Sequence, residues 1–214
     1  MTRFRSVVLD VDSTLSGVEG IDWLASLRGS EVEEWSANLT AKAMDGELPV
    51  EAVYSERLHL IKPTRFELER LADIYLSNVA AGAGEAIAAF QAKKIAVAMV
   101  SGGLREAILP LARELGVDEA RVRAVSVFFG EDGSYAGFEE TSSLTRQKGK
   151  QLAVKGLALE TPVLAVGDGM TDLEIKPVVH SFAAYTGFAR REQVVQGADF
   201  VIGNFDQLRE LVLG

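Results

Sequence analysis

Hydrophobic and polar positions along the chain follow two different periods. Near the N-terminus, and again from about residue 82, short apolar runs typical of buried parallel strands alternate with stretches of helical period. We expect strands at residues 7–9, 95–100, 163–166, 181–184 and 200–202, and helices at 84–92, 104–115, 149–155, 191–196 and 205–213. This alternation predicts an α/β fold, with a doubly wound and mostly parallel Rossmann-like sheet.

Between the first strand and residue 79 the pattern is helical throughout. Ser30 and Thr64 are each followed three residues later by a glutamate, a spacing typical of capping boxes that open helices at 30–46 and 64–76. Pro49 predicts the start of a helix that runs to residue 61, and a short helix is expected at 21–27. We therefore expect an α/β core of residues 1–15 and 79–214, with a helical-bundle cap at 16–78.

Two local signals refine the second half of the chain. Asp132-Gly133 lies between the apolar runs 122–129 and 135–139, which predicts a β-hairpin. Pro110 falls inside the helix expected at 104–115 and is expected to kink or split it, because proline lacks the amide hydrogen that a helix uses.

Composition narrows the range of partners. The 214 residues carry a net charge of −9 and no long basic run, which argues against nucleic acid and favours a small-molecule substrate. No apolar run approaches the roughly 18 residues of a membrane span, so we expect no membrane association and a cytoplasmic location. There is no cysteine, which excludes thiol catalysis. Composition does not indicate an oligomeric state.

Polar residues follow three of the expected strands. Asp10 and Asp12 end the first, Ser101 and Gly102 end the second, and Asp168 lies after the third. The carboxyl ends of parallel strands meet at one edge of a sheet, so these side chains are expected around one crevice together with Asp172. Four carboxylates would repel an anionic substrate, and Mg²⁺ is the cation that such oxygen ligands favour. We therefore expect strict dependence on Mg²⁺.

This arrangement suits phosphoryl transfer through an aspartyl phosphate. Asp10 would be the nucleophile, since a carboxylate is ionised at neutral pH without help from a base. Asp12 would act as general acid and base. The Ser101 hydroxyl and the Gly102 amide, expected at a helix N-terminus, would hold phosphoryl oxygens. Lys148 is the candidate counter-charge, and we assign Lys150 to the surface.

Four ordered motifs resemble those of the haloacid dehalogenase superfamily of phosphatases. They are Asp10-Val11-Asp12-Ser13-Thr14, Ser101-Gly102-Gly103, Lys148-Gly149-Lys150 and Gly167-Asp168-Gly169-Met170-Thr171-Asp172. The resemblance implies Asp10 as nucleophile, Asp12 as acid/base, and Mg²⁺ held by the side chains of Asp10 and Asp168 and the backbone carbonyl of Asp12. It implies that Asp172 supports the waters around the metal or Lys148. Supporting roles follow for Gly103, Gly169 and Thr171.

The chain is more narrowly similar to the phosphoserine phosphatase family. That resemblance rests on Glu19-Gly20-Ile21-Asp22, Ala43-Met44, Glu56-Arg57-Leu58 and Tyr135-Ala136-Gly137-Phe138. It implies hydrolysis of O-phospho-L-serine, a reaction of serine biosynthesis, with Glu19 at the substrate ammonium and Arg57 at its carboxylate. A phosphorylated amino acid offers one cation and one planar anion, which Glu and Arg match. Met44 is a further candidate for substrate binding.

Two cap residues depart from that family's pattern. Val50 stands where a phenylalanine is usual, and Asp45 where glycine or glutamate is familiar. Loss of the aromatic side chain could admit other small phosphomonoesters. Two other functions remain open: a phosphotransferase that passes phosphate to an alcohol such as homoserine, and a non-enzymatic switch domain phosphorylated on an aspartate. We expect the cap to open and close, with hinges near Pro49, residues 15–18 and residues 79–82.

Overall fold

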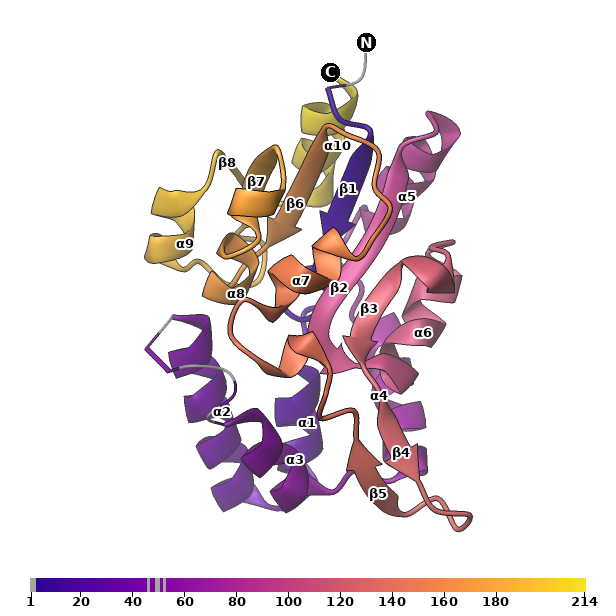
Figure 1. The fold of residues 1–214 in the computed structure, drawn as a ribbon, viewed down its shortest axis with the longest axis vertical. Helices are drawn as coiled ribbons and strands as arrows, with labels where there is room; N and C mark the ends of the chain where they lie inside the picture. The colour runs from indigo at the N-terminus through magenta and orange to yellow at the C-terminus, as the bar shows by residue number, and fades with distance from the viewer. Residues whose placement is uncertain (1–2, 46, 49–50, 52) are drawn as a thin grey trace.

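The computed structural model describes residues 3–45, 47–48, 51 and 53–214. Its main sheet has six strands in the order β3-β2-β1-β6-β7-β8, all of them parallel (Figure 1). The strands are β1 (Ser6–Leu9), β2 (Ala96–Leu104), β3 (Val122–Val125), β6 (Val163–Gly167), β7 (Ser181–Tyr185) and β8 (Phe200–Ile202). The predicted α/β fold with a mostly parallel sheet is confirmed.

The first strand lies at the centre of this sheet. Leu9 is paired with Met99 of β2 on one side and with Val166 of β6 on the other. All four residues of β1 are buried, as the continuous apolar run predicted for a parallel strand covered on both faces. Whatever follows Leu9 therefore emerges in the middle of the carboxyl edge.

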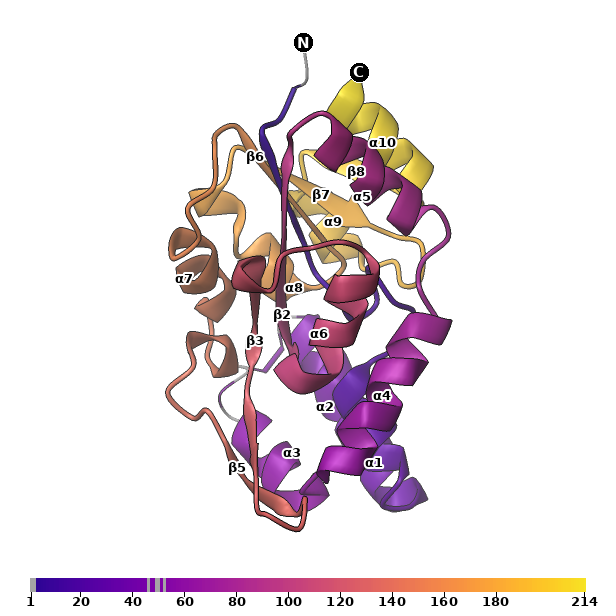
Figure 2. The ribbon, with the colours of Figure 1, turned by 90° about the vertical axis from the view of Figure 1, so that its right-hand side faces the viewer.

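Helices cover both faces of the sheet, as Figures 1 and 2 show, with α5 and α10 on one side and α7 on the other. The helices of this part of the chain are α5 (Ala83–Ala92), α6 (Arg105–Glu114), α7 (Gly149–Lys155), α8 (Met170–Leu173), α9 (Glu192–Gly197) and α10 (Phe205–Leu213). Short 3₁₀ turns lie at Glu119–Arg121, Ser143–Thr145 and Lys176–Val178. Helix α6 contains Pro110 without being split, so of the predicted kink or split, the split is wrong.

Four further helices lie beyond the carboxyl edge of the sheet, in the lower half of Figure 1. They are α1 (Gly20–Ser26), α2 (Ser30–Met44), α3 (Tyr54–Ile61) and α4 (Arg65–Ser77). The antiparallel hairpin of β4 (Val127–Phe129) and β5 (Tyr135–Phe138) extends into the same region. The hairpin is shorter than predicted, because residues 122–125 form β3 of the main sheet instead.

The two predicted capping boxes have different outcomes. At α4, Thr64 Oγ1 accepts from the Glu67 amide and Glu67 Oε2 accepts from the Thr64 amide, which confirms the box. At α2 the box is wrong: Ser30 is already the first helical residue, and the N-cap is Gly29 with a φ of 104°. The predicted helix start at Pro49 lies outside the described residues, and α3 begins at Tyr54.

Among the described residues, no helix combines the length and the apolar character that crossing a membrane requires.

Candidate active site

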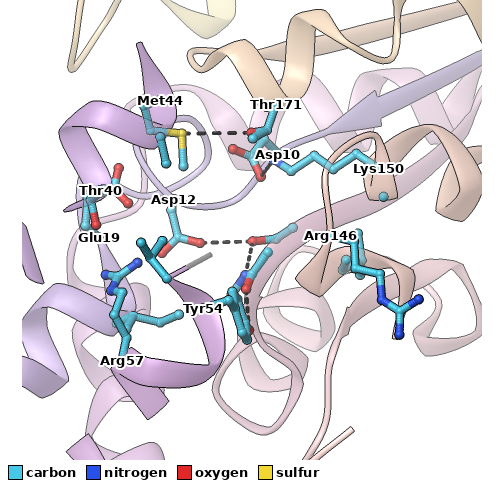
Figure 3. Close-up of a pocket in the computed structure, with 18 of the residues that line it drawn as sticks. Asp10, Asp12, Glu19, Thr40, Met44, Tyr54, Arg57, Arg146, Lys150 and Thr171 are labelled. Carbon is cyan, nitrogen blue, oxygen red and sulfur yellow. Dashed lines mark hydrogen bonds and ion pairs between the residues drawn. The ribbon is translucent and has the colours of Figure 1, made fainter. Parts of the chain in front are cut away.

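Three neighbouring strand ends bring the predicted residues to one place. Asp10 follows β1 directly, Ser101 lies near the end of β2, and Asp168 follows β6. Asp10, Asp12, Ser101, Gly102 and Gly103 line one cavity with residues from the helices beyond the sheet (Figure 3). The sheet therefore supplies one wall of the site, and α1, α2 and α3 supply the other.

Asp10, Asp168 and Asp172 form a buried cluster of carboxylates. One oxygen from each lies within 4.8 Å of the others. Burial, reinforced by repulsion from Asp172, raises the pKa of Asp10 well above its ordinary value and that of Asp168 to about 7. Lys150 opposes the rise at Asp10, and Arg191 opposes it at Asp168.

This cluster fits a hard divalent cation. The donors are all carboxylate oxygens, the type that Mg²⁺ prefers. Asp10 Oδ1 is buried, and Lys150 Nζ approaches it to 2.8 Å without the alignment of a hydrogen bond, so a lone pair of this oxygen is left for a cation. A bound cation would favour the ionised carboxylates and so oppose both the burial and the repulsion that raise the two pKa values.

Lys150, not Lys148, is the cation of the site. Lys150 Nζ lies 2.8 Å from Asp10 Oδ1 and 2.6 Å from Asp172 Oδ1, and the residue is 7% exposed. Burial alone would lower the pKa of Lys150, but the two carboxylates outweigh it, so the pKa is raised and the ammonium stays charged. The assignment of Lys150 to the surface is wrong.

Lys148 is exposed and adopts a left-handed conformation, with φ 59°, as the N-cap of α7. Its amide donates to Glu174 Oε2. Glycine is required between the two lysines, because a Cβ at Gly149 would lie 1.8 Å from the Ser143 carbonyl oxygen. The predicted role of Lys148 as counter-charge is therefore wrong, and Asp172 contacts Lys150 instead.

Asp12 receives hydrogen bonds on both of its oxygens. Its Oδ1 accepts from the Gly20 amide at 2.7 Å and from the Tyr75 hydroxyl at 2.6 Å. Its Oδ2 accepts from Ser101 Oγ at 2.9 Å, and Ser101 Oγ in turn accepts from the Gly103 amide. The carboxylate is thus held in one orientation at the centre of the cavity (Figure 3).

The glycine loop at the end of β2 differs in one respect from the prediction. Strand β2 continues to Leu104 and α6 begins at Arg105, so Gly102 precedes the helix and its amide is not in the first turn. The Gly102 carbonyl accepts from the Tyr54 hydroxyl at 2.8 Å, a contact between α3 and this loop. Ser101 and Gly102 still line the cavity, as predicted for groups that hold a phosphoryl oxygen.

Glu19 lies in the same cavity as Asp12. Its Oε1 accepts from Ser13 Oγ at 2.6 Å. Burial and the nearby Asp12 carboxylate raise the pKa of Glu19 to about 8, although the Ser13 hydroxyl works in the opposite direction. A cation placed against Glu19 would stabilise its charged form.

Arg57 reaches the cavity from α3 and is 8% exposed. Its Nη2 lies 2.5 Å from Asp22 Oδ1, and its Nε donates to Ser36 Oγ at 3.0 Å. Asp22 Oδ1 also accepts from Ser36 and Thr40. These contacts orient the guanidinium beside Glu19, as Figure 3 shows, so the site presents one anion and one cation together.

Two contacts join the end of α2 to α8 and to the loop after β7. Met44 lines the cavity, and its sulfur accepts from Thr171 Oγ1 at 3.9 Å; a Cβ at Gly169 would lie 2.5 Å from the same sulfur. Arg191 lies 3.4 Å from Asp168 Oδ2 and 3.2 Å from Asp45 Oδ1. Val50, which with Asp45 departs from the pattern of the phosphoserine phosphatase family, lies outside the described residues.

Four residues of this site were missed by the sequence reasoning. Asp22 and Lys150 lie inside motifs that had been recognised, so their positions alone could have nominated them. Tyr75 and Arg191 carry no such signal, because a tyrosine on an amphipathic helix and an arginine in a loop are ordinary residues. Their contacts with Asp12 and Asp168 depend on chain crossings that only the folded structure reveals.

Comparison with known proteins agrees with this geometry. The chloroplastic phosphoserine phosphatase of Arabidopsis thaliana is 36% identical over 95% of this chain and 70% of its own length. The phosphoserine phosphatase of Homo sapiens is 34% identical over 95% of this chain and 91% of its own. A phosphoserine phosphohydrolase-like protein from Francisella tularensis superposes with a TM-score of 0.89 at 25% identity, covering 98% of this chain and 100% of the other.

A sequence profile of the haloacid dehalogenase-like hydrolase family matches residues 4–175. This range includes the carboxyl ends of β1, β2 and β6, and only β7 and β8 of the main sheet lie beyond it. The predicted resemblance is confirmed, and the chain is an enzyme. It belongs to the haloacid dehalogenase-like hydrolase family.

Proposed function

We propose that this enzyme hydrolyses O-phospho-L-serine to serine and phosphate through an aspartyl phosphate on Asp10, with Mg²⁺ as its cofactor. The observation that carries the proposal is a single cavity lined by Asp10 and Asp12 at one end and by Glu19 and Arg57 at the other. The same cavity thus offers a nucleophile and an acid/base to a phosphate, and a charge pair to an amino acid. The names of the relatives at 34–36% identity support this substrate.

The chain's own groups account for both halves of the reaction. An Asp10 oxygen attacks phosphorus, the bond from phosphorus to the serine oxygen breaks, and Asp12 gives its proton to that oxygen. Asp12 then takes a proton from a water molecule as the water oxygen attacks phosphorus. The bond from phosphorus to Asp10 breaks, which returns the free carboxylate. Lys150 and the Ser101 hydroxyl would offset charge on the transferred group.

Asp10 and Asp168, with the backbone carbonyl of Asp12, would hold Mg²⁺, and Asp172 would orient Lys150 beside it. The ion would supply charge that lets an anionic phosphate approach a cluster of carboxylates. Raised pKa values at Asp10 and Asp168 support this assignment, because burial, and after it repulsion from Asp172, disfavours the ionised carboxylates until a cation offsets their charge.

The end of the cavity lined by Glu19 and Arg57 has the charges that an α-amino acid substrate needs. Glu19 would pair with the ammonium and Arg57 with the carboxylate, and the Asp22 and Ser36 contacts would hold the guanidinium ready. A phosphorylated switch domain would have no use for this second charge pair. Met44 would close the cavity from the side of α2.

We also propose that residues 16–78 act as a cap over a core of residues 1–15 and 79–214. The two segments predicted as hinges lie side by side: the Ala80 amide donates to the Leu15 carbonyl, and the Gly17 amide donates to the Asn78 carbonyl. Both connections to the cap therefore cross at one point, where a rotation would move α1–α4 together. Closure would exclude bulk water while the phosphoenzyme exists. Pro49, the third predicted hinge, lies outside the described residues.

The test is to trap the phosphoenzyme. Radiolabelled phosphoserine, mixed with enzyme and Mg²⁺ and quenched in acid, should label Asp10, and Asp10→Asn should fold but neither become labelled nor turn over. Turnover that persists in excess chelator, or labelling elsewhere, would contradict the proposal. Added homoserine should leave the product as free phosphate; transfer to the alcohol would identify a phosphotransferase. Slow, sub-stoichiometric phosphate release would identify a switch.

A further inference from the structure

The hydroxyl of Tyr75 lies 2.6 Å from Asp12 Oδ1, and Tyr75 is fully buried. Tyr75 is on α4, some sixty positions from Asp12 along the chain, so the contact is not a product of local geometry. The Gly20 amide donates to the same oxygen at 2.7 Å. Two donors therefore converge on Oδ1.

The opposite oxygen of Asp12 faces the cavity. Asp12 Oδ2 accepts from Ser101 Oγ, and Ser101 lines the cavity. Gly20 and Tyr75 are not among the described residues that line it. The carboxylate thus has an inner oxygen occupied by donors from the protein, and an outer oxygen that faces the position of a substrate.

Room for the tyrosine hydroxyl is made by a glycine. A Cβ at Gly20 would lie 2.0 Å from the Tyr75 hydroxyl and 3.2 Å from Asp12 Oδ1. The position of the phenol is therefore fixed from three sides, by Gly20, by Asp12 and by the packing of α4.

From this geometry we infer that Tyr75 is a positioning residue, which holds Asp12 so that Oδ2 carries the proton to the leaving serine oxygen. This deepens the proposed function and rests on it. With Oδ1 already accepting from an amide and a phenol, the proton that Asp12 delivers resides on Oδ2, on the side of the cavity. Without the phenol, only the Gly20 amide holds Oδ1 and only Ser101 holds Oδ2, so the orientation of the carboxylate is less firmly set and either oxygen can carry the proton.

The leaving group provides the test. Serine is a poor leaving group whose oxygen needs a proton as it departs, whereas p-nitrophenolate leaves without one. In Tyr75→Phe, we expect the single-turnover rate of phosphoenzyme formation from phosphoserine to fall about tenfold with little change in KM, which is part of the roughly 10²–10⁴-fold that a general acid contributes, because Asp12 itself remains. The burst of p-nitrophenolate from p-nitrophenyl phosphate should keep its rate. A purely structural defect would slow both substrates alike.

Tyr135→Phe is the matched control. It also removes a buried tyrosine hydroxyl, but that hydroxyl has no hydrogen-bond partner among the described residues and Tyr135 does not line the cavity. Both substrates should react with it at the wild-type rate. Equal slowing of the two substrates in Tyr75→Phe, or no slowing of either, overturns the inference.

A second readout does not depend on turnover. A crystal structure of Tyr75→Phe should show the Asp12 carboxylate rotated away from its contacts with Gly20 and Ser101, and an unrotated carboxylate would overturn the inference. If the wild-type enzyme forms no phosphoenzyme, the proposed function fails instead, and the orientation of Asp12 still decides whether Tyr75 positions it.

Discussion

Lys150 Nζ lies 2.8 Å from Asp10 Oδ1, at a point where both residues are almost completely buried. The same ammonium donates to Asp172 Oδ1 at 2.6 Å. A single cation thus neutralises part of a three-carboxylate cluster, and its position is set by the first turn of α7. The net charge of this cluster therefore depends on the first turn of α7 directing Lys150, and not Lys148, toward the carboxylates.

Lys150→Met should lower kcat by about a hundredfold or more, since removing one preorganised electrostatic contact at a reacting centre commonly costs that much. It leaves the length of the side chain nearly unchanged and removes only the charge. Steady-state kinetics with phosphoserine measure the effect. Because losing one partner of a buried ion pair also destabilises a protein by roughly 3–5 kcal/mol, the unfolding midpoint must be measured in parallel.

Lys148→Met is the matched control, two positions away in the same motif. Its side chain is exposed and does not line the cavity, so activity should be close to that of the wild type, and stability should change by no more than about 0.5 kcal/mol, as for other surface substitutions. A large loss in Lys148→Met with an active Lys150→Met would restore the assignment made from the sequence.

The fold was largely predictable because its strands are short, fully apolar runs that end in polar or glycine-rich loops. Helix α7 and helix α10 begin and end where the periodicity placed them. Tertiary pairing decided what the pattern could not: residues 122–125 have the character of a hairpin strand, yet they pair with β2. Pro110 is accommodated within α6, although its sequence signal is that of a helix breaker.

The site was predictable wherever chemistry follows a strand end. Asp10, Ser101 and Asp168 meet because parallel strands share an edge. The sequence could not show which of Lys148 and Lys150 points into the site. The directions of the two side chains depend on the left-handed backbone conformation of residue 148, which no sequence pattern predicts. Tyr75 and Asp12 come together through the return of the chain from α4, which no local pattern encodes.

Arg57→Lys should raise KM for phosphoserine by about tenfold or more, because lysine cannot reproduce a planar, bidentate contact with a carboxylate. O-phosphoethanolamine has the same phosphate and ammonium but no carboxylate. Its KM should therefore change little in this variant. Equal effects on the two substrates would show that Arg57 serves only the packing of α3, through Asp22 and Ser36.

Glu19 should impose a pH dependence on substrate capture. Burial and the nearby Asp12 raise its pKa to about 8, so in the free enzyme it is increasingly protonated below that pH and cannot pair with an ammonium. In saturating Mg²⁺, kcat/KM for phosphoserine should rise with pH up to about 8, because that parameter reports the free enzyme. The analogue 3-phosphooxypropanoate lacks only the ammonium, so its kcat/KM should not show this ascending limb of the pH profile.

Glu19→Gln is the control for that assignment. The variant should lose the limb and have a lower kcat/KM for phosphoserine, while the analogue without an ammonium reacts at a similar rate. Persistence of the limb in Glu19→Gln would assign it to another group.

The metal-free enzyme should become less stable as pH rises. The folded pKa of Asp168, raised to about 7 by burial and by Asp172, exceeds its ordinary value of 3.8, so the folded state holds this proton more tightly than the unfolded chain does. The resulting loss of stability begins above the unfolded pKa and is complete above pH 7, and for this group it is on the order of 4 kcal/mol. Asp10, whose pKa is also raised, contributes in the same direction.

Urea unfolding in chelator at about pH 5.5 and about pH 8 measures this dependence of stability on pH. Asp168→Asn should flatten that slope, and Mg²⁺ should stabilise the wild type more at the higher pH, because there it binds carboxylates that are already ionised. Equal stability at the two pH values in chelator would contradict the view that this cluster is poised for a cation.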